Sequence, residues 1–314
     1  MPLNNCRFTW DKTHEVLNFI NSLFEYSEQI SLKQFKELMT IPETDPLNEN
    51  FLFRDSNTDE LVGVLRIINE LPISRMIGLI YCNSHSQYPK KNRLDNNIIL
   101  TEMIRLLETC AASNQTKIIH MQTFNKSMLE NALILLKWNK IKTYWKLSYT
   151  PMKTLDIHLP EGFHIRHFIY NQDEKLLTNI QNESFAKHWG FSPNTVKQIH
   201  HRVRMAGSYP ECISFIEKGS SIAAYSWGYI DESIPDKLTG LISMIGVHPL
   251  YRGKHLGTLA VISSINSLTN KGVYKILLEV DSDNKAAIKL YIKLGFVKES
   301  ESIWYEKKSQ LTTL

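Results

Sequence analysis

The stretch "GVHPLYRGKHLGT", residues 246–258, decides the fold predicted for the second half of this chain. It overlaps the end of an apolar run of strand length, residues 241–247, and leads into apolar residues at helical spacing, residues 258–270. The predicted order is therefore strand, basic glycine loop and helix N-terminus. Such a junction directs unpaired N–H groups and the positive end of a helix dipole at one point, which suits a diphosphate. The loop has neither the G-x-G-x-x-G nor the Walker A spacing, so we do not expect a dinucleotide or a nucleoside triphosphate.

A second motif lies downstream in "NKAAIKLYIKLGF", residues 284–296. Ala287, Leu290, Tyr291 and Leu294 recur at helical spacing and therefore share one face of a predicted helix. Gly295 follows the last of these residues and is expected to end the helix. The two motifs together are more specific than either one alone.

The order V-x-P-x-x-R-G-x-x-x-G, then an asparagine, then L-Y-x-K-L-G-F resembles the GCN5-related N-acetyltransferase (GNAT) family over residues 163–307. The resemblance implies that acetyl-CoA is the acetyl donor and that no metal takes part. His255 stands where the family has its middle glycine, and we expect its backbone N–H still to be usable there. The residues implied to bind acetyl-CoA are Met244, Ile245, Val247, Arg252, Gly253, Lys254, His255, Leu256, Gly257, Thr258, Asn284 and Ala287.

The resemblance also makes Tyr291 the candidate general acid, since a phenol with a pKa near 10 can protonate a departing thiolate. Without the motif, a tyrosine on an apolar helix face is usually a core residue. The general base is unassigned, because Leu241 lies near the place where many relatives carry glutamate. The candidates are His188, Glu183, Asp231, Glu232 and a water held by Ser243. His188 has the best intrinsic pKa, although it is equally a loop histidine that could stack on Trp189.

The two halves of the chain share one layout. Residues 273–308 indicate strand, loop, helix and strand, and residues 115–149 give the same order about 158 residues earlier. Residues 150–162 carry prolines near both ends and suit a connector. We therefore expect an α+β protein of two tandem GNAT-like domains, each a mixed, mostly antiparallel twisted sheet flanked by helices. The predicted divisions are a degenerate domain over residues 1–150, a linker over 151–162 and an acetyl-CoA-binding domain over 163–314. The alternative is a coincidence between two common strand–helix–strand units.

The first half has the composition of a lost site. Only Gly63 and Gly78 of the 13 glycines precede residue 160, and the expected first-copy loop, residues 86–100, contains none. Glycine supplies the positive φ angles and close backbone approach that such a loop needs. We expect the first domain to have lost catalysis, and a separate binding role for its basic loop stays open. This tandem layout, together with "NESFAKHWGF" at residues 182–191, resembles the branch of the family that contains mycothiol synthase.

Composition excludes several other classes. The net charge of +4 comes from dispersed residues, so we expect no nucleic-acid partner. The four cysteines lie far apart, which disfavours a zinc site or a disulfide framework and favours the cytoplasm. The N-terminus has no signal-peptide pattern and no apolar run approaches about 20 residues, so we expect no membrane association. A monomer or a homodimer is equally compatible with the sequence.

The most specific reading is therefore an N-acetyltransferase whose C-terminal domain acetylates a primary amine, with a small molecule as the expected acceptor. Two alternatives remain open. One is a peptide or protein N-terminal acetyltransferase. The other is a non-catalytic acetyl-CoA-binding pseudoenzyme, which the departures at Leu241 and His255 favour.

Overall fold

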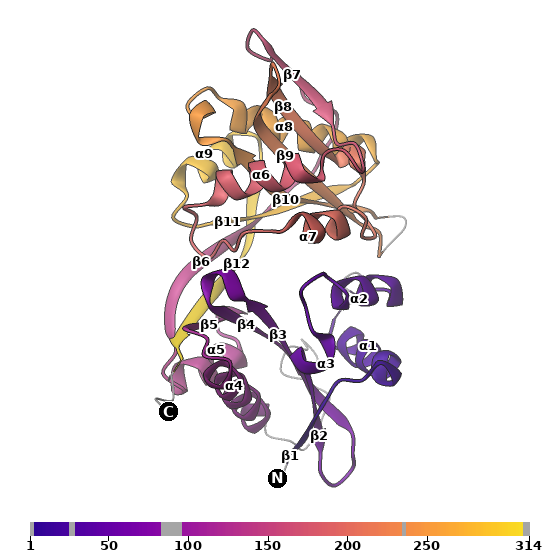
Figure 1. The fold of residues 1–314 in the computed structure, drawn as a ribbon, viewed down its shortest axis with the longest axis vertical. Helices are drawn as coiled ribbons and strands as arrows, with labels where there is room; N and C mark the ends of the chain where they lie inside the picture. Colours follow the sequence, from indigo (N-terminus) through magenta and orange to yellow (C-terminus); the bar gives the residue numbers. More distant parts are fainter. Residues whose placement is uncertain (1–2, 25–28, 83–95, 234–236, 310–314) are drawn as a thin grey trace. The chain divides into compact units, whose positions relative to one another are not determined.

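The computed structural model describes residues 3–24, 29–82, 96–233 and 237–309. The chain divides into two compact units (Figure 1). Unit 1 comprises Met1–Tyr144 and Glu301–Leu314, and unit 2 comprises Trp145–Ser300. Each unit is described by itself.

The sheet of unit 1 is antiparallel except for one pair of strands. Its order is β1 (Leu3–Arg7), β2 (Asn50–Asp55), β3 (Leu61–Glu70), β4 (Arg75–Cys82), β5 (Ile118–Phe124) and the end of β12 (Val297–Lys308). Strands β4 and β5 are the parallel pair, and β12 runs antiparallel to β5 from Ser302 onward.

Helices cover both faces of this sheet (Figure 1). One apolar core lies between the sheet and the helices α4 (Asn96–Ser113) and α5 (Met128–Leu135). A second core lies on the opposite face, under α1 (Thr13–Ser22) and α2 (Leu32–Met39). A short helix, α3 (Pro46–Glu49), precedes β2. Alternation along the strands sends successive side chains to the two cores.

Unit 2 repeats this plan. Its sheet order is the end of β6 (Asn139–Tyr149), β11 (Lys275–Asp281), β10 (Thr239–Val247), β9 (Ser221–Asp231), β8 (Ile213–Lys218) and β7 (Phe163–His167). Strands β10 and β11 form a parallel pair, as β4 and β5 do in unit 1. Helices α6 (Glu174–Phe185) and α7 (Val196–Arg202) cover one face, and α8 (Leu256–Asn270) and α9 (Lys285–Lys293) cover the other. Short 3-10 turns occur in unit 1 at Trp10–Lys12 and Leu71–Ile73, and in unit 2 at Pro210–Cys212 and Pro249–Tyr251.

The predicted fold class, two mixed and mostly antiparallel sheets flanked by helices, is confirmed. The compact units nevertheless differ from the expected divisions at residues 150 and 163. Strand β6 leaves unit 1 after Tyr144, and β12 enters unit 1 at Glu301. Both are long strands, of 11 and 12 residues, and a strand's own pattern does not reveal which sheet each of its ends will join.

No helix in the described part of the chain is both long and apolar enough to cross a membrane.

Candidate active site

Strands β10 and β11 separate in the middle of the unit 2 sheet. They pair from Thr239 with Lys275 to Ile242 with Leu278, and no residue of β10 pairs with β11 beyond that point. A β-bulge at Ser243 marks the separation, and β10 then continues to pair with β9 alone. The edge of β10 from residue 244 to residue 247 is therefore open on the β11 side.

The open edge presents backbone N–H groups. The N–H of His248 donates to Ala223, next to β9, at 2.9 Å. Because direction alternates along an extended strand, the N–H groups of Ile245 and Val247 point the other way, into the separation between β10 and β11. The N–H of Ile245 is therefore directed at any acceptor that lies in the separation.

The loop after β10 leads directly into α8 with its N–H groups unused. Among the residues that the structure describes, none accepts a hydrogen bond from the backbone nitrogens of residues 253–257. The side chains of Arg252, Lys254 and His255 are exposed around them. A run of free N–H groups at the start of a 15-residue helix is the arrangement that binds phosphate oxygens.

Two residues of this loop adopt left-handed backbone conformations. Gly253 has φ +79° and His255 has φ +60° with ψ 9°. His255 is thus held in a conformation that costs a non-glycine residue about 1 kcal/mol or more. The strain expected for histidine at this position is present, and its N–H remains in the free run.

Gly257 leaves space that the protein does not fill. A Cβ atom placed there would meet only Val247 Cγ2 at 3.7 Å and Leu290 Cδ1 at 3.8 Å, which are ordinary contacts. Packing therefore does not require glycine at this position. The small residue instead keeps room beside the free N–H groups.

Helix α9 carries the second motif. Asn284 is its N-cap, and the side-chain oxygen of Asn284 accepts from the N–H of Ala287 at 3.1 Å. The predicted helix face packs on the core of unit 2, and the helix is followed by Gly295 at φ +96°. Burial raises the pKa of Tyr291 to about 12, and its ring lies edge-on to Phe296 at 5.8 Å. Its hydroxyl has no hydrogen-bond partner among the described residues.

The C-terminal end of α6 packs on the opposite face of β10. A Cβ on Gly246 would lie 2.8 Å from Ser184 Oγ and 2.4 Å from Tyr225 Cε1, so this glycine is required for the close approach. Arg252 donates from Nη2 to the carbonyl of Ser184 at 2.9 Å, and His248 Nε2 lies 3.1 Å from a carboxylate oxygen of Glu183. The loop that carries the free N–H groups is therefore tied to the end of α6.

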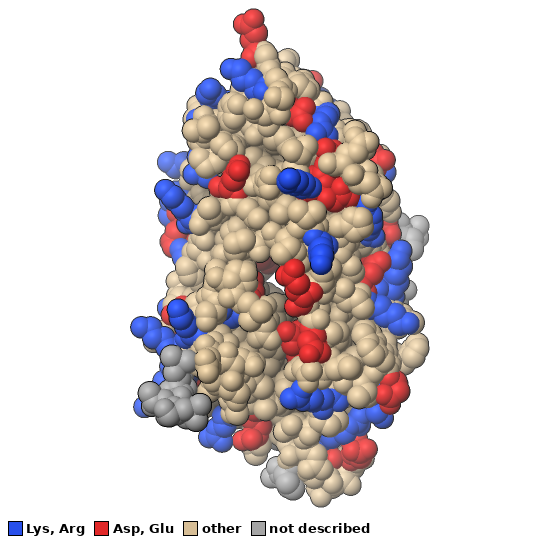
Figure 2. All heavy atoms as spheres, in the orientation of Figure 1, with Lys and Arg blue, Asp and Glu red and all other residues tan. Residues whose placement is uncertain are grey.

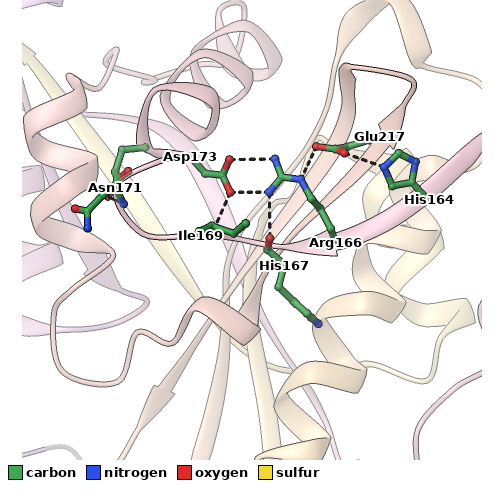
Figure 3. A network of polar contacts seen from close by, with 8 residues as sticks. His164, Arg166, His167, Ile169, Asn171, Asp173 and Glu217 are labelled. Atoms are coloured by element: carbon green, nitrogen blue, oxygen red, sulfur yellow. Dashed lines mark hydrogen bonds and ion pairs between the residues drawn. The ribbon is translucent and has the colours of Figure 1, made fainter.

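The other end of α6 is anchored by a partly buried ionic network. Figure 3 shows the Arg166 guanidinium donating two hydrogen bonds to Asp173, at 2.6 and 3.0 Å. The same arginine donates to Glu217 at 2.8 Å, and His164 contacts the second oxygen of Glu217 at 2.9 Å. A bidentate arginine–carboxylate pair fixes orientation as well as distance. It holds the start of α6 against β7 and β8.

The structure separates the candidate general bases. His188 lies just after α6, where its ring is edge-on to Phe185 at 5.5 Å and its Nδ1 is 3.2 Å from the carbonyl of Trp189. Glu183 forms the contact with His248 already described. Ser243 is exposed at the bulge.

The remaining two candidate bases, Asp231 and Glu232, lie at the end of β9 that is far from the separation. Asp231 pairs with Thr239, whereas Ser226 pairs with Ile245. Five residues of strand separate these positions, a distance of about 17 Å. Glu232 follows Asp231 and accepts a short hydrogen bond from Tyr209. The suggestion that Asp231 or Glu232 acts beside Ile245 is therefore wrong, because β9 carries both away from the separation.

Sequence reasoning missed one carboxylate at the separation. Glu279 is the first residue of β11 beyond the last paired residue, Leu278, and it is exposed. Its neighbours Leu278 and Val280 belong to the core under α8 and α9, so alternation directs Glu279 to the other face. The signal was an acidic residue interrupting the apolar run "ILLEV" 12 residues before Tyr291.

Charge and metal-ligating groups add little to this site. On the face drawn in Figure 2, basic and acidic side chains are interspersed without a band of one sign. Within the described ranges, no group of three His, Cys, Asp or Glu side chains could hold a metal ion. The first-copy loop expected at residues 86–100 lies largely outside the described residues, which resume at Asn96.

Comparison with known proteins agrees with this geometry. Residues 175–296 match the model of the acetyltransferase (GNAT) family. This segment of unit 2 is therefore similar to GNAT domains. A mycothiol acetyltransferase of Amycolatopsis mediterranei (strain U-32) is 26% identical over 151 residues, which are 47% of this chain and 50% of that protein. The chain spans about half the length of the curated relatives it matches.

Solved structures extend the likeness in fold to both units. A GCN5-related N-acetyltransferase from Sphaerobacter thermophilus has a TM-score of 0.72 and 15% identity, with 98% of this chain and 95% of that chain covered. A tandem GNAT protein from the clavulanic acid biosynthesis pathway has a TM-score of 0.71 and 10% identity, with 98% and 99% covered. The tandem arrangement of two GNAT-like folds is therefore shared with known proteins.

Proposed function

We propose that unit 2 transfers the acetyl group of acetyl-CoA directly to a primary amine of a small molecule. The observation that carries the proposal is the continuity of the open β10 edge with the free N–H groups of residues 253–257. A thioester donor with a diphosphate needs both features, one for each end of the molecule. The mycothiol acetyltransferases that resemble this segment support a small-molecule acceptor.

Acetyl-CoA would be held along this continuous backbone. The diphosphate oxygens would accept from the N–H groups of residues 253–257, with charge from Arg252 and Lys254. The space at Gly257 admits the oxygens to the helix N-terminus. The pantetheine arm would run along residues 244–247 in place of the missing β11 partner. Asn284 and Ala287, at the start of α9, would line the other side of the arm.

The chemistry follows from these positions. The amine nitrogen attacks the thioester carbonyl carbon, and the carbonyl oxygen gains negative charge, which the N–H of Ile245 stabilises. Collapse of this intermediate breaks the carbon–sulfur bond and releases the CoA thiolate. The products are the acetylated amine, coenzyme A and one proton in total.

Tyr291 acts on the departing sulfur. With a pKa of about 12 the phenol is protonated at neutral pH. A thiol has a pKa of about 8.5, so complete proton transfer from this phenol to the thiolate costs about 5 kcal/mol. Tyr291 is therefore better suited to donate a hydrogen bond to the developing thiolate than to surrender its proton.

A base must remove the proton that the amine carries. An alkylammonium near pKa 10 is almost fully protonated at pH 7, which costs about 4 kcal/mol to reverse. We place Glu279 in this role, since it lies at the separation on the face opposite α9. The amine then approaches from the α6 side of the sheet, and the sulfur leaves on the α9 side, beside Tyr291. His188 remains the second candidate, a few residues beyond the contact between Ser184 and Gly246.

The proposal is tested by thiol release from acetyl-CoA across a panel of small primary amines. Tyr291→Phe should lower kcat about 100-fold or more while acetyl-CoA still binds. Tyr274→Phe is the matched control, because Tyr274 is 49% exposed at the start of β11. Binding of acetyl-CoA without turnover on any amine or peptide would identify a pseudoenzyme. Turnover restricted to peptides would contradict the small-molecule acceptor, and absence of binding would contradict the proposal as a whole.

A further inference from the structure

Unit 1 contains an arginine, Arg66, that forms no ion pair with any residue the structure describes. Arg66 lies on β3, opposite Leu79 of β4. Strands β4 and β5 pair only as far as Gly78 with Met121, so Arg66 lies beside the point where these strands separate. This is the position in unit 1 that corresponds to the separation of β10 and β11 in unit 2.

The guanidinium of Arg66 has one hydrogen bond among the described residues. It donates from Nη2 to the carbonyl of Leu38, at 2.7 Å, near the end of α2. No described carboxylate lies within ion-pair distance of Arg66, whereas Arg54 has two such carboxylates and Arg75 has one. Desolvation lowers the pKa of Arg66 from its ordinary value, and the side chain is only partly exposed. An arginine offers five N–H donors, so most of its hydrogen-bonding capacity is unused by the protein.

The acidic group near Arg66 is Glu49, which hydrogen-bonds to other residues. Glu49 lies close enough to Arg66 to affect its charge, but its two oxygens accept from Asn69 Nδ2 at 2.8 Å and from the N–H of Asp45 at 3.0 Å. Burial raises the pKa of Glu49, and the hydrogen bonds from Asn69 and Asp45 oppose this shift. Glu49 therefore uses its oxygens for other hydrogen bonds and forms no ion pair with Arg66.

A phenol lies beside this cation. Tyr81 of β4 pairs with Val64, two residues from Arg66 on the same face of the sheet, so the two side chains are diagonal neighbours. Arg66 lowers the pKa of Tyr81, although burial raises it by more, so the hydroxyl stays protonated and able to donate. The tyrosine ring lies edge-on to Phe24 at 6.3 Å, within the apolar cluster under α1 and α2. No hydrogen bond of its hydroxyl is found within the described residues.

We propose that Arg66 and Tyr81 bind the carboxylate of a small monoanionic molecule with an apolar body, on the α1–α2 face of unit 1. A planar carboxylate matches the guanidinium fork with two parallel hydrogen bonds and accepts a third from the phenol. One guanidinium and one neutral phenol balance a single negative charge, and the nearby Glu49 disfavours a dianion such as a phosphate. The side chains of Phe24 and the α1–α2 cluster supply the apolar contact. This site is independent of the activity proposed for unit 2.

The test uses butyrate and its neutral isostere butyramide on the intact chain, by calorimetry at constant ionic strength. Butyrate should bind to one saturable site in the millimolar range, and butyramide at least tenfold more weakly. Arg66→Gln should weaken butyrate binding at least tenfold. Arg66→Lys should weaken it by a smaller factor, because lysine keeps the positive charge although it loses the forked geometry. Tyr81→Phe should weaken it about two- to tenfold through the loss of one hydrogen bond.

Arg105→Gln is the matched control, because it removes the same charge from an exposed position on α4 of unit 1. It should leave butyrate binding unchanged. Circular dichroism and thermal unfolding check that each variant is folded, and Tyr81→Phe keeps the test valid if Arg66→Gln does not fold. Equal butyrate and butyramide binding, butyrate binding undiminished in both the Arg66 and Tyr81 variants, or no saturable butyrate binding would each overturn the proposal.

Discussion

Gly257 is the position where stability and cofactor affinity should change in opposite directions. A methyl group there meets only two side chains, both at ordinary distance, and Gly257 is the second residue of α8. Alanine is favoured over glycine in helix interiors by about 1 kcal/mol, and less near a helix end. Gly257→Ala should therefore raise the free energy of unfolding by about 0.5 kcal/mol in the absence of ligand.

The same methyl group would occupy the space beside the free N–H groups of residues 253–257. A diphosphate would then have to withdraw from them, and the affinity for acetyl-CoA should fall about 10- to 100-fold, or about 1.4 to 2.7 kcal/mol. Urea unfolding measures the first effect and titration calorimetry with acetyl-CoA the second. An alanine variant that binds acetyl-CoA as tightly as the wild type would refute the assignment of this space to the diphosphate.

Gly272, at the other end of the same helix, provides the control. It has φ +80°, and no atom lies within 4 Å of the position that a Cβ would take. Gly272→Ala forces alanine into the left-handed region and should cost about 1 kcal/mol of stability without changing acetyl-CoA affinity. The two substitutions are chemically identical, so opposite outcomes cannot arise from the loss of glycine itself.

Three further predictions concern stability. Asp173→Asn removes the charge that Arg166 binds and should lower the free energy of unfolding in urea by about 2 kcal/mol. The Asp173 side chain is only 5% exposed, which makes the loss costly. Arg166 is 29% exposed and keeps its contact with Glu217, which limits the loss. His255→Gly should stabilise the protein by about 0.5 kcal/mol in the same assay, because it relieves a left-handed conformation at the cost of greater chain entropy. Tyr291 and Tyr305 have folded-state pKa values of about 12 against an ordinary 10, so their contribution to stability should be constant below pH 10 and be lost between pH 10 and 12. A titration followed at 295 nm that shows both tyrosines ionising near pH 10 would contradict the last prediction.

Local signals in the sequence were sufficient for the elements around the site. The run at residues 241–247 is the end of β10, and the helical pattern at residues 258–270 lies within α8. Gly295 follows the end of α9 with positive φ, as its position predicted. These features depend on residues close together in the chain, where periodicity and helix-end preferences act.

Features that depend on register could not be read in this way. The distance from Asp231 to Ile245 follows from the pairing of β9 with β10, and the position of Glu279 follows from where β10 and β11 stop pairing. The bond from Arg252 to the carbonyl of Ser184 joins residues 68 positions apart. No local pattern in a single sequence records such distances, because register is set by which faces the whole sheet buries.

Both units keep an opening between two parallel strands, although the residues beside the opening differ. In each unit a parallel pair of strands holds for four residues and then separates, after Gly78 with Met121 in unit 1 and after Ile242 with Leu278 in unit 2. That separation follows from strand order and twist, which many residues determine together. A diphosphate cradle depends on a few backbone conformations that single substitutions can remove, whereas a charged side chain such as Arg66 can be gained by one substitution. Under the two proposals, the same kind of opening would lie beside a backbone-bound donor in unit 2 and beside a side-chain-bound anion in unit 1, without any change of fold.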